Sequence, residues 1–282
     1  MISVKLENLK GSPVMNLEGF FARHPVFTVR EIAASLDSEK PRASKAMNSL
    51  LAYHTRAGHI MRVRRGLYVT LPSGSSPSTY SLDPFLLAAR MTEDAVLAYY
   101  TALEFHGKAY SSHKNFTYAT RKILRPSHVR SYRFRAVQFP KALRLKGKED
   151  FEVANAERAG LAVRVTTLER TLVDVLDRPN LSGSWEQIWR SLESVEFFDL
   201  SKVVEYAVLL GNATTAAKVG FFLDQHRDVL MVKETHLKPL RDMKPRRPHY
   251  LERSKRHSGR LIQAWNLVVP ESVVTRSWAE IS

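Results

Sequence analysis

Cysteine is missing from this sequence of 282 residues. Its absence excludes disulfides, thiolate nucleophiles and cysteine-ligated zinc sites, and it fits a reducing compartment. Long apolar runs are missing as well. The longest strongly apolar stretches, residues 95–103 and 203–210, fall well short of the roughly 20 residues that cross a bilayer. Charged side chains interrupt residues 1–11, which therefore lack the apolar core of a secretory signal. We expect a cytoplasmic protein without a membrane partner.

Acidic residues are few compared with basic ones. The chain has 43 Lys and Arg against 28 Asp and Glu, which gives a formal net charge of +15. Such an excess favours a polyanionic partner, because binding neutralises phosphates and releases counterions. The charge by itself does not separate DNA from RNA, an acidic protein or a lipid surface.

Motifs of common enzyme classes are also absent. The sequence has no Gly-x-x-x-x-Gly-Lys-Ser/Thr phosphate loop, no Gly-x-Ser-x-Gly elbow and no His-Glu-x-x-His zinc helix. The ten histidines do not show the ligand spacing of a familiar metal site. We therefore expect no metal, no cofactor and no enzymatic activity.

One run rich in Pro, Ser and Gly, residues 71–81, divides the chain. Such composition is typical of a linker between two periodic regions. We predict an N-terminal domain over residues 1–71, a linker over residues 72–81 and a C-terminal domain over residues 82–282.

Three helical patterns precede the linker. The first covers residues 17–24. The second opens at Thr28, which stands three residues before Glu31 and so has the spacing of a capping box. The third lies between Pro41, a residue favoured near helix starts, and Gly58, a residue favoured at helix ends.

A hairpin pattern follows these helices. Residues 60–69 alternate between apolar and polar side chains, and Arg65 and Gly66 supply the turn. Three helices followed by a hairpin is the element order of a winged helix-turn-helix domain. The sequence therefore predicts a domain of this kind at the N-terminus.

The third predicted helix has a polar face opposite Met47, Leu50 and Leu51. Such a helix lies in the major groove, where Arg and Asn contact base edges and Lys meets phosphate. A basic face exposed only to solvent is the alternative, which the order of elements disfavours. The predicted DNA-contacting residues of this helix are Arg42, Lys45, Asn48, Ser49 and Arg56.

The predicted hairpin is basic at its tip. Arg62, Arg64 and Arg65 cluster around Gly66. Guanidinium groups in this place can enter a minor groove or hold the DNA backbone. A charged loop without a partner is the alternative. We predict that these three arginines contact DNA beside the helix.

The region after the linker mixes helical and strand patterns, so the chain as a whole is predicted to be α+β. Thr166 and Glu169 form a second capping-box pattern, which opens a helix through Leu176. Two or three more helices are expected between Trp185 and His226. The remaining expected helices cover residues 84–89 and 95–105, and the expected strands cover residues 116–119, 132–139, 163–166 and 264–269.

A second basic region lies within the C-terminal domain. Residues 121–148 contain ten Lys or Arg and no Asp or Glu. Positive charges this close in the sequence repel one another unless a negatively charged partner approaches. This region could extend the DNA footprint, contact an acidic protein or bind RNA. A third basic stretch, residues 238–260, is interpreted as a surface loop. The possible second basic surface comprises Arg121, Lys122, Arg125, Arg130, Arg133, Arg135, Arg246 and Arg247.

A cluster of charged residues follows the second capping-box pattern. Carboxylates close together, such as Asp174 and Asp177, can bind a metal or move protons. An alternative function is therefore a nucleic-acid-processing enzyme with a winged-helix targeting domain, with Glu169 or Asp174 in its site. The structural interpretation is simpler: Glu169 caps the helix, and Arg170 and Asp174 pair at positions i and i+4.

Two segments resemble a known family. Residues 64–69, Arg-Arg-Gly-Leu-Tyr-Val, and residues 165–174, Val-Thr-Thr-Leu-Glu-Arg-Thr-Leu-Val-Asp, resemble antitoxins of the AbiEi type from type IV abortive-infection toxin–antitoxin systems, which act in phage defence. The resemblance implies a winged helix that represses its own operon by binding promoter repeats, and a C-terminal domain that counters a nucleotidyltransferase-like toxin, directly or functionally. Repeated half-sites imply a homo-oligomer on DNA. Gly183-Ser184 lacks the following Asp-x-Asp of a nucleotidyltransferase, so the chain resembles the antitoxin.

Overall fold

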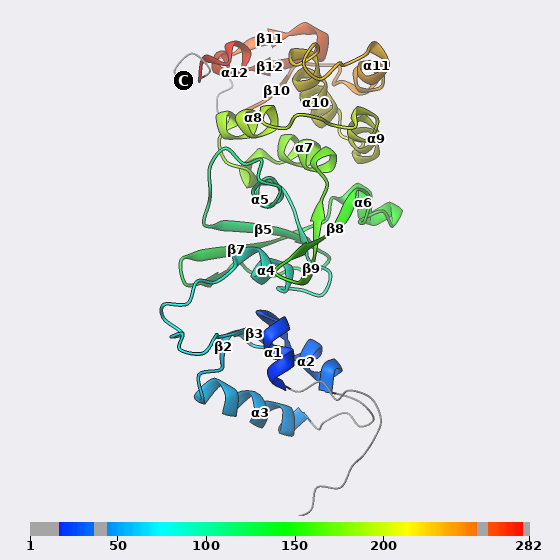
Figure 1. Cartoon of the computed structure of the whole chain (residues 1–282). Coiled ribbons are helices and arrows are strands. Elements are labelled where there is room, and N and C mark those ends of the chain that lie inside the picture. The colour runs from blue at the N-terminus through cyan, green and yellow to red at the C-terminus, as the bar shows by residue number, and fades with distance from the viewer. Residues whose placement is uncertain (1–16, 37–43, 253–258, 279–282) are drawn as a thin grey trace, which may run out of the picture. The chain divides into compact units, whose positions relative to one another are not determined.

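The computed structural model describes residues 17–36, 44–252 and 259–278 (Figure 1). The chain forms two compact units, and the main division between them falls after Leu82. Within the described residues, every helix is too short or too polar to span a lipid bilayer.

The N-terminal unit has the element order and sheet topology of a winged helix-turn-helix. Its three strands form an antiparallel sheet in the order β1-β3-β2. The predicted N-terminal fold is thus confirmed, with one strand, β1, that the sequence did not predict. The elements are α1 (Leu17–Arg23), β1 (Val26–Thr28), α2 (Val29–Leu36), α3 (Ser44–Arg56), β2 (Ile60–Arg64) and β3 (Leu67–Thr70).

The predicted capping box at the start of α2 is confirmed. The backbone N–H of Thr28 donates to Oε2 of Glu31 at 2.7 Å, and the backbone N–H of Glu31 donates to the Thr28 hydroxyl oxygen at 3.2 Å. These bonds satisfy two donors that a helix start leaves without intrahelical partners. Thr28 is therefore both the last residue of β1 and the residue that caps α2.

The core of the N-terminal unit joins all its elements. Phe27 of β1 lies edge-on to Phe20 of α1, with ring centroids 5.2 Å apart, and stacks on Tyr68 of β3 at 5.8 Å. Burying such side chains is the main force that holds small domains together. The buried cluster comprises Phe20, Phe27, Ile32, Met47, Leu51, Ile60 and Tyr68.

The C-terminal unit begins with a mixed six-stranded sheet in the order β6-β7-β5-β4-β9-β8. β5 runs parallel to β7 and β4 runs parallel to β9, whereas β6 and β7 form an antiparallel hairpin. The strands are β4 (Val96–Leu97), β5 (Asn115–Thr120), β6 (Ser127–Val129), β7 (Tyr132–Gln138), β8 (Val153–Arg158) and β9 (Leu161–Thr166).

Helices and a small second sheet complete this unit. In Figure 1, helices α7 to α10 lie between the six-stranded sheet and the small sheet, whose order is β10-β12-β11. Trp189 and Trp265, both fully buried, belong to the core that the helices share. The elements are α4 (Pro84–Ala89), α5 (Tyr100–Phe105), α6 (Lys141–Lys146), α7 (Leu168–Asp177), α8 (Trp185–Glu193), α9 (Leu200–Leu210), α10 (Ala213–Gln225), α11 (Glu234–Met243), β10 (His249–Tyr250), β11 (Arg260–Ile262), β12 (Leu267–Val269) and α12 (Glu271–Thr275), with short 3₁₀ turns at Pro179–Leu181 and Gln263–Trp265.

The α+β class predicted for the whole chain is confirmed, but three expected elements are wrong in part. Residues 95–105 are not one helix, because Val96–Leu97 form strand β4 before α5 begins. A short apolar run fits a buried strand as well as a helix. The expected last strand is reduced to β12, because the 3₁₀ turn occupies its first residues. Residues 238–243 belong to helix α11 and not to a loop.

The second capping-box prediction has the wrong register. Thr167, not Thr166, caps α7, and its hydroxyl accepts from the backbone N–H of Arg170 at 3.4 Å. Thr166 ends strand β9 and bonds the hydroxyl of Thr171 at 2.7 Å. Glu169 accepts from the backbone N–H of Asp199 at 3.2 Å and so ties α7 to the start of α9. Two consecutive threonines leave the register of a cap undecided in the sequence.

Candidate nucleic-acid interface

The exposed face of α3 carries the polar residues that the sequence predicts. Lys45, Asn48, Ser49 and Arg56 are all exposed, whereas Met47 and Leu51 of the same helix are buried in the core. The division follows the helical period, which places residues three and four apart on one face. The predicted Arg42 lies outside the described residues.

Two of these side chains fold back on their own helix. The Ser49 hydroxyl donates to the carbonyl oxygen of Lys45 at 3.0 Å, and Nε of Arg56 donates to the carbonyl oxygen of Ala52 at 3.3 Å. Ser49 keeps its oxygen as an acceptor, and Arg56 keeps its terminal N–H groups as donors. Lys45 and Asn48 are therefore the members of this face best suited to reach into a groove.

Tyr53 extends this face and was missed by the sequence analysis. Its side chain is 60% exposed, although large aromatic side chains are mostly buried. It stands four residues after Ser49, so the two lie on the same side of α3. A tyrosine in this place can donate its hydroxyl to a phosphate. The sequence signal for its exposure was its position outside the apolar stripe of α3 formed by Met47, Leu50 and Leu51.

The hairpin of β2 and β3 presents the predicted arginines. Arg62, Arg64 and Arg65 are all exposed. Gly66 closes the turn with φ of +82°, a left-handed conformation that favours glycine. The carbonyl of Gly66 accepts from the backbone N–H of Val29, at 3.0 Å, so the hairpin turn is fastened to the start of α2. This hairpin of β2 and β3 is the wing of the domain, and it is thus held to α2.

The electrostatics of this unit favour an anionic ligand. Between Glu39 and Asp83 the sequence contains no acidic residue, and this stretch includes all of α3 and the wing. The described cations of both elements therefore have no carboxylate nearby in the sequence. A concave or extended surface of one charge attracts a polyanion and speeds its association.

A pair of histidines fixes the connection between α3 and β2. Nδ1 of His54 lies 3.0 Å from Nδ1 of His59, so one ring donates a proton that the other accepts. Burial, and then the nearby His59, lower the pKa of His54 below its usual 6.5. This bond holds the helix end close to the wing while at most one of the two rings is charged.

The second basic surface is divided in the structure. Arg133 and Arg135 are exposed on the same face of β7. Arg121 pairs with Glu149, with 3.0 Å between Nε and Oε1. Lys122, Arg125 and Arg130 are exposed around these strands, whereas Arg246 and Arg247 are exposed between α11 and β10.

The last two arginines are separated from the others. α11 and β10 stand on the far side of helices α7 to α10 from the six-stranded sheet (Figure 1). The structure therefore does not bring Arg246 and Arg247 together with the six cations near β6 and β7, and the two groups form separate basic areas of this unit.

The charged cluster of α7 is structural. Asp174 is buried, and it accepts from Nε of Arg170 at 3.4 Å and from the Tyr206 hydroxyl at 2.6 Å. Arg170 is equally buried and donates to the carbonyl oxygen of Phe151 at 2.6 Å. The predicted i and i+4 pair is thus present and lies inside the helical core. No face of Asp174 is open to a substrate.

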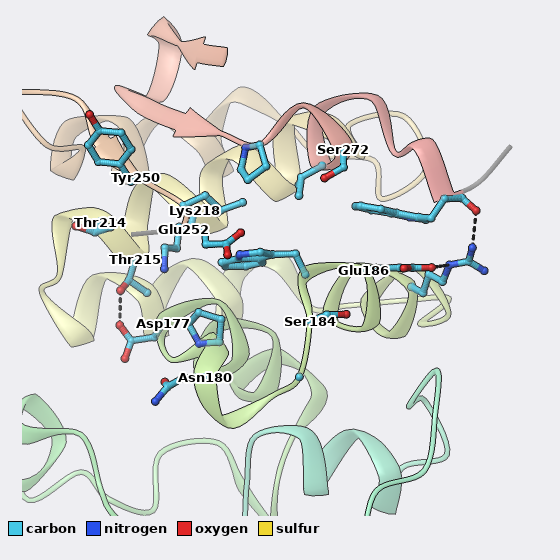
Figure 2. Close-up of a pocket in the computed structure, with 18 of the residues that line it drawn as sticks. Asp177, Asn180, Ser184, Glu186, Thr214, Thr215, Lys218, Tyr250, Glu252 and Ser272 are labelled. Carbon is cyan, nitrogen blue, oxygen red and sulfur yellow. Dashed lines mark hydrogen bonds and ion pairs between the residues drawn. The ribbon is translucent and has the colours of Figure 1, made fainter. Parts of the chain in front are cut away.

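A cleft of about 1480 Å³ opens between α8, α10, β10 and α12. Figure 2 shows Asp177 bonded to Thr215 at its lower edge. Lys218 donates from Nζ to the carbonyl oxygen of Leu176 at 3.0 Å, and Glu186 pairs with Arg190 at 3.1 Å. The cleft therefore contains both positively and negatively charged side chains, and these side chains bond to neighbouring residues.

Comparisons with known proteins bear on both units. Residues 18–70 match the model of a family described as transcriptional regulator, AbiEi antitoxin. The family resemblance predicted from the sequence is confirmed over this segment. The whole chain is similar to the crystal structure of the RV2827C protein from Mycobacterium tuberculosis, with 17% identity, a TM-score of 0.58 and 94% of each chain covered. At this identity the similarity concerns the fold. No curated protein matches the chain.

Proposed function

We propose, on the premise that residues 18–70 match the AbiEi family of antitoxin regulators, that this protein represses its own promoter and acts as the antitoxin of a type IV toxin–antitoxin system. The observation that carries the proposal is the exposed basic face of α3 and the wing, which come from a stretch of sequence without acidic residues. A basic helix followed by a basic hairpin on a winged-helix fold suits duplex DNA.

The two elements have different roles in this proposal. Lys45 and Asn48 enter the major groove, where Asn48 can pair with an adenine edge and Lys45 with phosphate. Arg62, Arg64 and Arg65 hold the adjacent backbone or minor groove. Binding to promoter repeats places more than one copy of the chain on the DNA. Because phosphate contacts release counterions, affinity is expected to fall steeply with salt.

The C-terminal unit carries the antitoxin role in this proposal. It counters a nucleotidyltransferase-like toxin, either by binding the toxin directly or by opposing the toxin's effect on the cell without contact. Its separate basic area between α11 and β10, with exposed Arg246 and Arg247, suits an acidic surface on such a partner. The alternative of a nucleic-acid-processing enzyme is disfavoured, because Glu169 and Asp174 are engaged in contacts within the fold.

The test is a fluorescence anisotropy titration of the full chain on the duplex upstream of its own gene, with a scrambled duplex as competitor, at two salt concentrations. We expect saturable, competitor-resistant binding. Lys45→Ala is expected to lower the slope of log affinity against log salt by about 1. Lys238→Ala, which removes an exposed cation from α11, is the matched control.

Two further results decide between the parts of the proposal. Equal binding to promoter and scrambled duplex contradicts sequence-specific repression. Co-expression with the adjacent gene tests the antitoxin role separately: growth arrest by that gene alone, relieved by this protein, supports it. Growth arrest that this protein does not relieve contradicts it.

A further inference from the structure

A cationic groove lies in the C-terminal unit, away from the winged helix in the sequence. Its volume is about 540 Å³, and strand β7, helix α6, the end of α7 and the residue before α10 form its walls. Four cations line it against a single carboxylate, that of Asp177. The cations are Arg135, Lys141, Arg144 and Arg178.

The positive charge of the groove is only partly compensated within the described residues, because four cations face one carboxylate. Asp177 accepts from the Thr215 hydroxyl, as Figure 2 shows, and from Nδ2 of Asn212 at 3.3 Å. Arg135 and Lys141 are exposed and form no ion pair in the described part of the chain. Cations that outnumber the carboxylates of a recess raise its potential and favour an anion.

The other two guanidinium groups are oriented by the fold. Nε of Arg144 donates to the carbonyl oxygen of Phe139 at 3.1 Å, which leaves its terminal N–H groups for a ligand. The guanidinium of Arg178 stands 5.8 Å from the ring centre of Tyr99. Guanidinium groups held in this way form directed, charge-assisted bonds to phosphate oxygens.

The cations continue along β7 beyond the groove. Arg133 and Arg135 are two residues apart on one strand, so they share a face and lie about 6.6 Å apart. The register places exposed Asn115 and His128 beside Arg133 on the neighbouring strands. A line of positive charge that leads into a recess suits a chain of linked phosphates better than a single free phosphate.

We propose that this groove binds the phosphodiester backbone of a single-stranded nucleic acid. A positively charged groove that follows the backbone is how proteins bind single strands without reading their sequence. A duplex is a stiff rod whose phosphates cannot follow a recess between a helix and a strand, whereas a single strand can. This site is separate from the promoter interface on α3 and the wing, and it does not depend on the proposed repression.

The experiment titrates the full chain against fluorescein-labelled oligo(U) and oligo(dT), which form no secondary structure, and records anisotropy. We expect saturable binding, and a loss of about 10-fold in affinity for Arg135→Glu/Lys141→Glu, because a phosphate contact contributes to affinity through its charge. The matched control is Lys238→Glu/Arg246→Glu, which makes the same change of charge outside the groove. Arg135→Lys/Lys141→Arg keeps the charge and is expected to bind as the wild type does.

The outcomes separate this proposal from promoter binding. The groove variant is expected to bind the promoter duplex normally, whereas Arg62→Glu/Arg65→Glu is expected to lose the duplex and keep the single strand. Tighter binding of oligo(U) than oligo(dT) identifies RNA as the ligand, and the reverse identifies DNA. Absence of saturable binding, unchanged binding by the groove variant, or equal competition by inorganic phosphate or poly-glutamate overturns the proposal.

Discussion

Nε of Arg170 lies 3.4 Å from Oδ2 of Asp174, and both side chains are at most 3% exposed. The guanidinium also donates to the carbonyl oxygen of Glu149 at 2.7 Å. Burial raises the pKa of Asp174 above its usual value, and the charge of Arg170 opposes this rise. The pair therefore holds α7 to the segment before β8 at the cost of removing two charges from water.

Arg170→Met is expected to destabilise the C-terminal unit by about 3–5 kcal/mol, because it leaves the carboxyl of Asp174 buried without its counter-charge. Urea denaturation followed by tryptophan fluorescence measures this, since all four tryptophans lie after Leu82. The double variant Arg170→Met/Asp174→Leu is expected to lose less stability than Arg170→Met alone. Arg227→Met, which breaks an exposed pair with Asp224, is the control and is expected to change the free energy of unfolding little. A cost for Arg170→Met no larger than that of the control would contradict the prediction.

Glu104 gives a pH-dependent prediction. Its Oε1 accepts from the backbone N–H of His113 at 2.6 Å, and burial raises its pKa to about 7. The folded pKa lies above the usual 4.5, so stability is highest while the acid is protonated and falls as the pH rises through 7. Glu104→Gln keeps an oxygen for His113 and removes the charge. We expect a higher melting temperature than the wild type near pH 8 and a much smaller difference near pH 5.

The control for this prediction is Glu196→Gln, which changes an exposed carboxylate on the loop after α8. It is expected to change the melting temperature little at either pH. A Glu104→Gln variant that is less stable than the wild type at both pH values would show that the ionised carboxylate is required.

The histidine pair predicts that α3 loosens in acid. The pKa of His54 is lowered, so its neutral form stabilises the fold above pH 6.5 and this contribution is lost as the pH falls. Protonation of both rings also breaks the bond between the two Nδ1 atoms. Hydrogen exchange of the α3 amides is expected to show lower protection factors near pH 5.5 than near pH 7.5. In the His59→Gln variant the protection factors of α3 should depend less on pH than in the wild type. An equal dependence on pH in the variant and the wild type would refute this account.

Tyr53 is expected to contribute to DNA binding and not to stability. Because its side chain is 60% exposed, Tyr53→Ala should leave the protection of α3 nearly unchanged. The loss of one hydrogen bond to phosphate is expected to weaken promoter binding about 5-fold, equivalent to about 1 kcal/mol. Tyr53→Phe removes the hydroxyl and keeps the ring, so it should reproduce most of the loss of affinity. Unchanged affinity in both variants would place Tyr53 outside the interface.

Local sequence determined most of the N-terminal unit. The capping box of Thr28 and Glu31, the helical period of α3 and the turn at Gly66 all depend on residues within a few positions of one another. Such interactions form in the same way whatever the rest of the chain does. They were sufficient to predict which side chains of α3 and the wing are exposed, and the family segment coincides with them.

Tertiary contacts decided the features that have no local signal. β1 and β4 contain three and two residues, too few to show a period, and they are strands because they pair with β3 and β5. Arg170 and Asp174 have the same spacing whether their helix face is exposed or buried, so only packing against Tyr206 placed them in the core.

The cationic groove depends on tertiary structure in the same way. Arg135 lies in β7 and Arg144 in α6, whereas Arg178 directly follows α7 and Asn212 directly precedes α10. The sequence determined that residues 121–148 are basic, because composition is independent of folding. Only the fold decided which of these charges meet in one recess, because the approach of distant segments depends on the burial of apolar side chains throughout the unit.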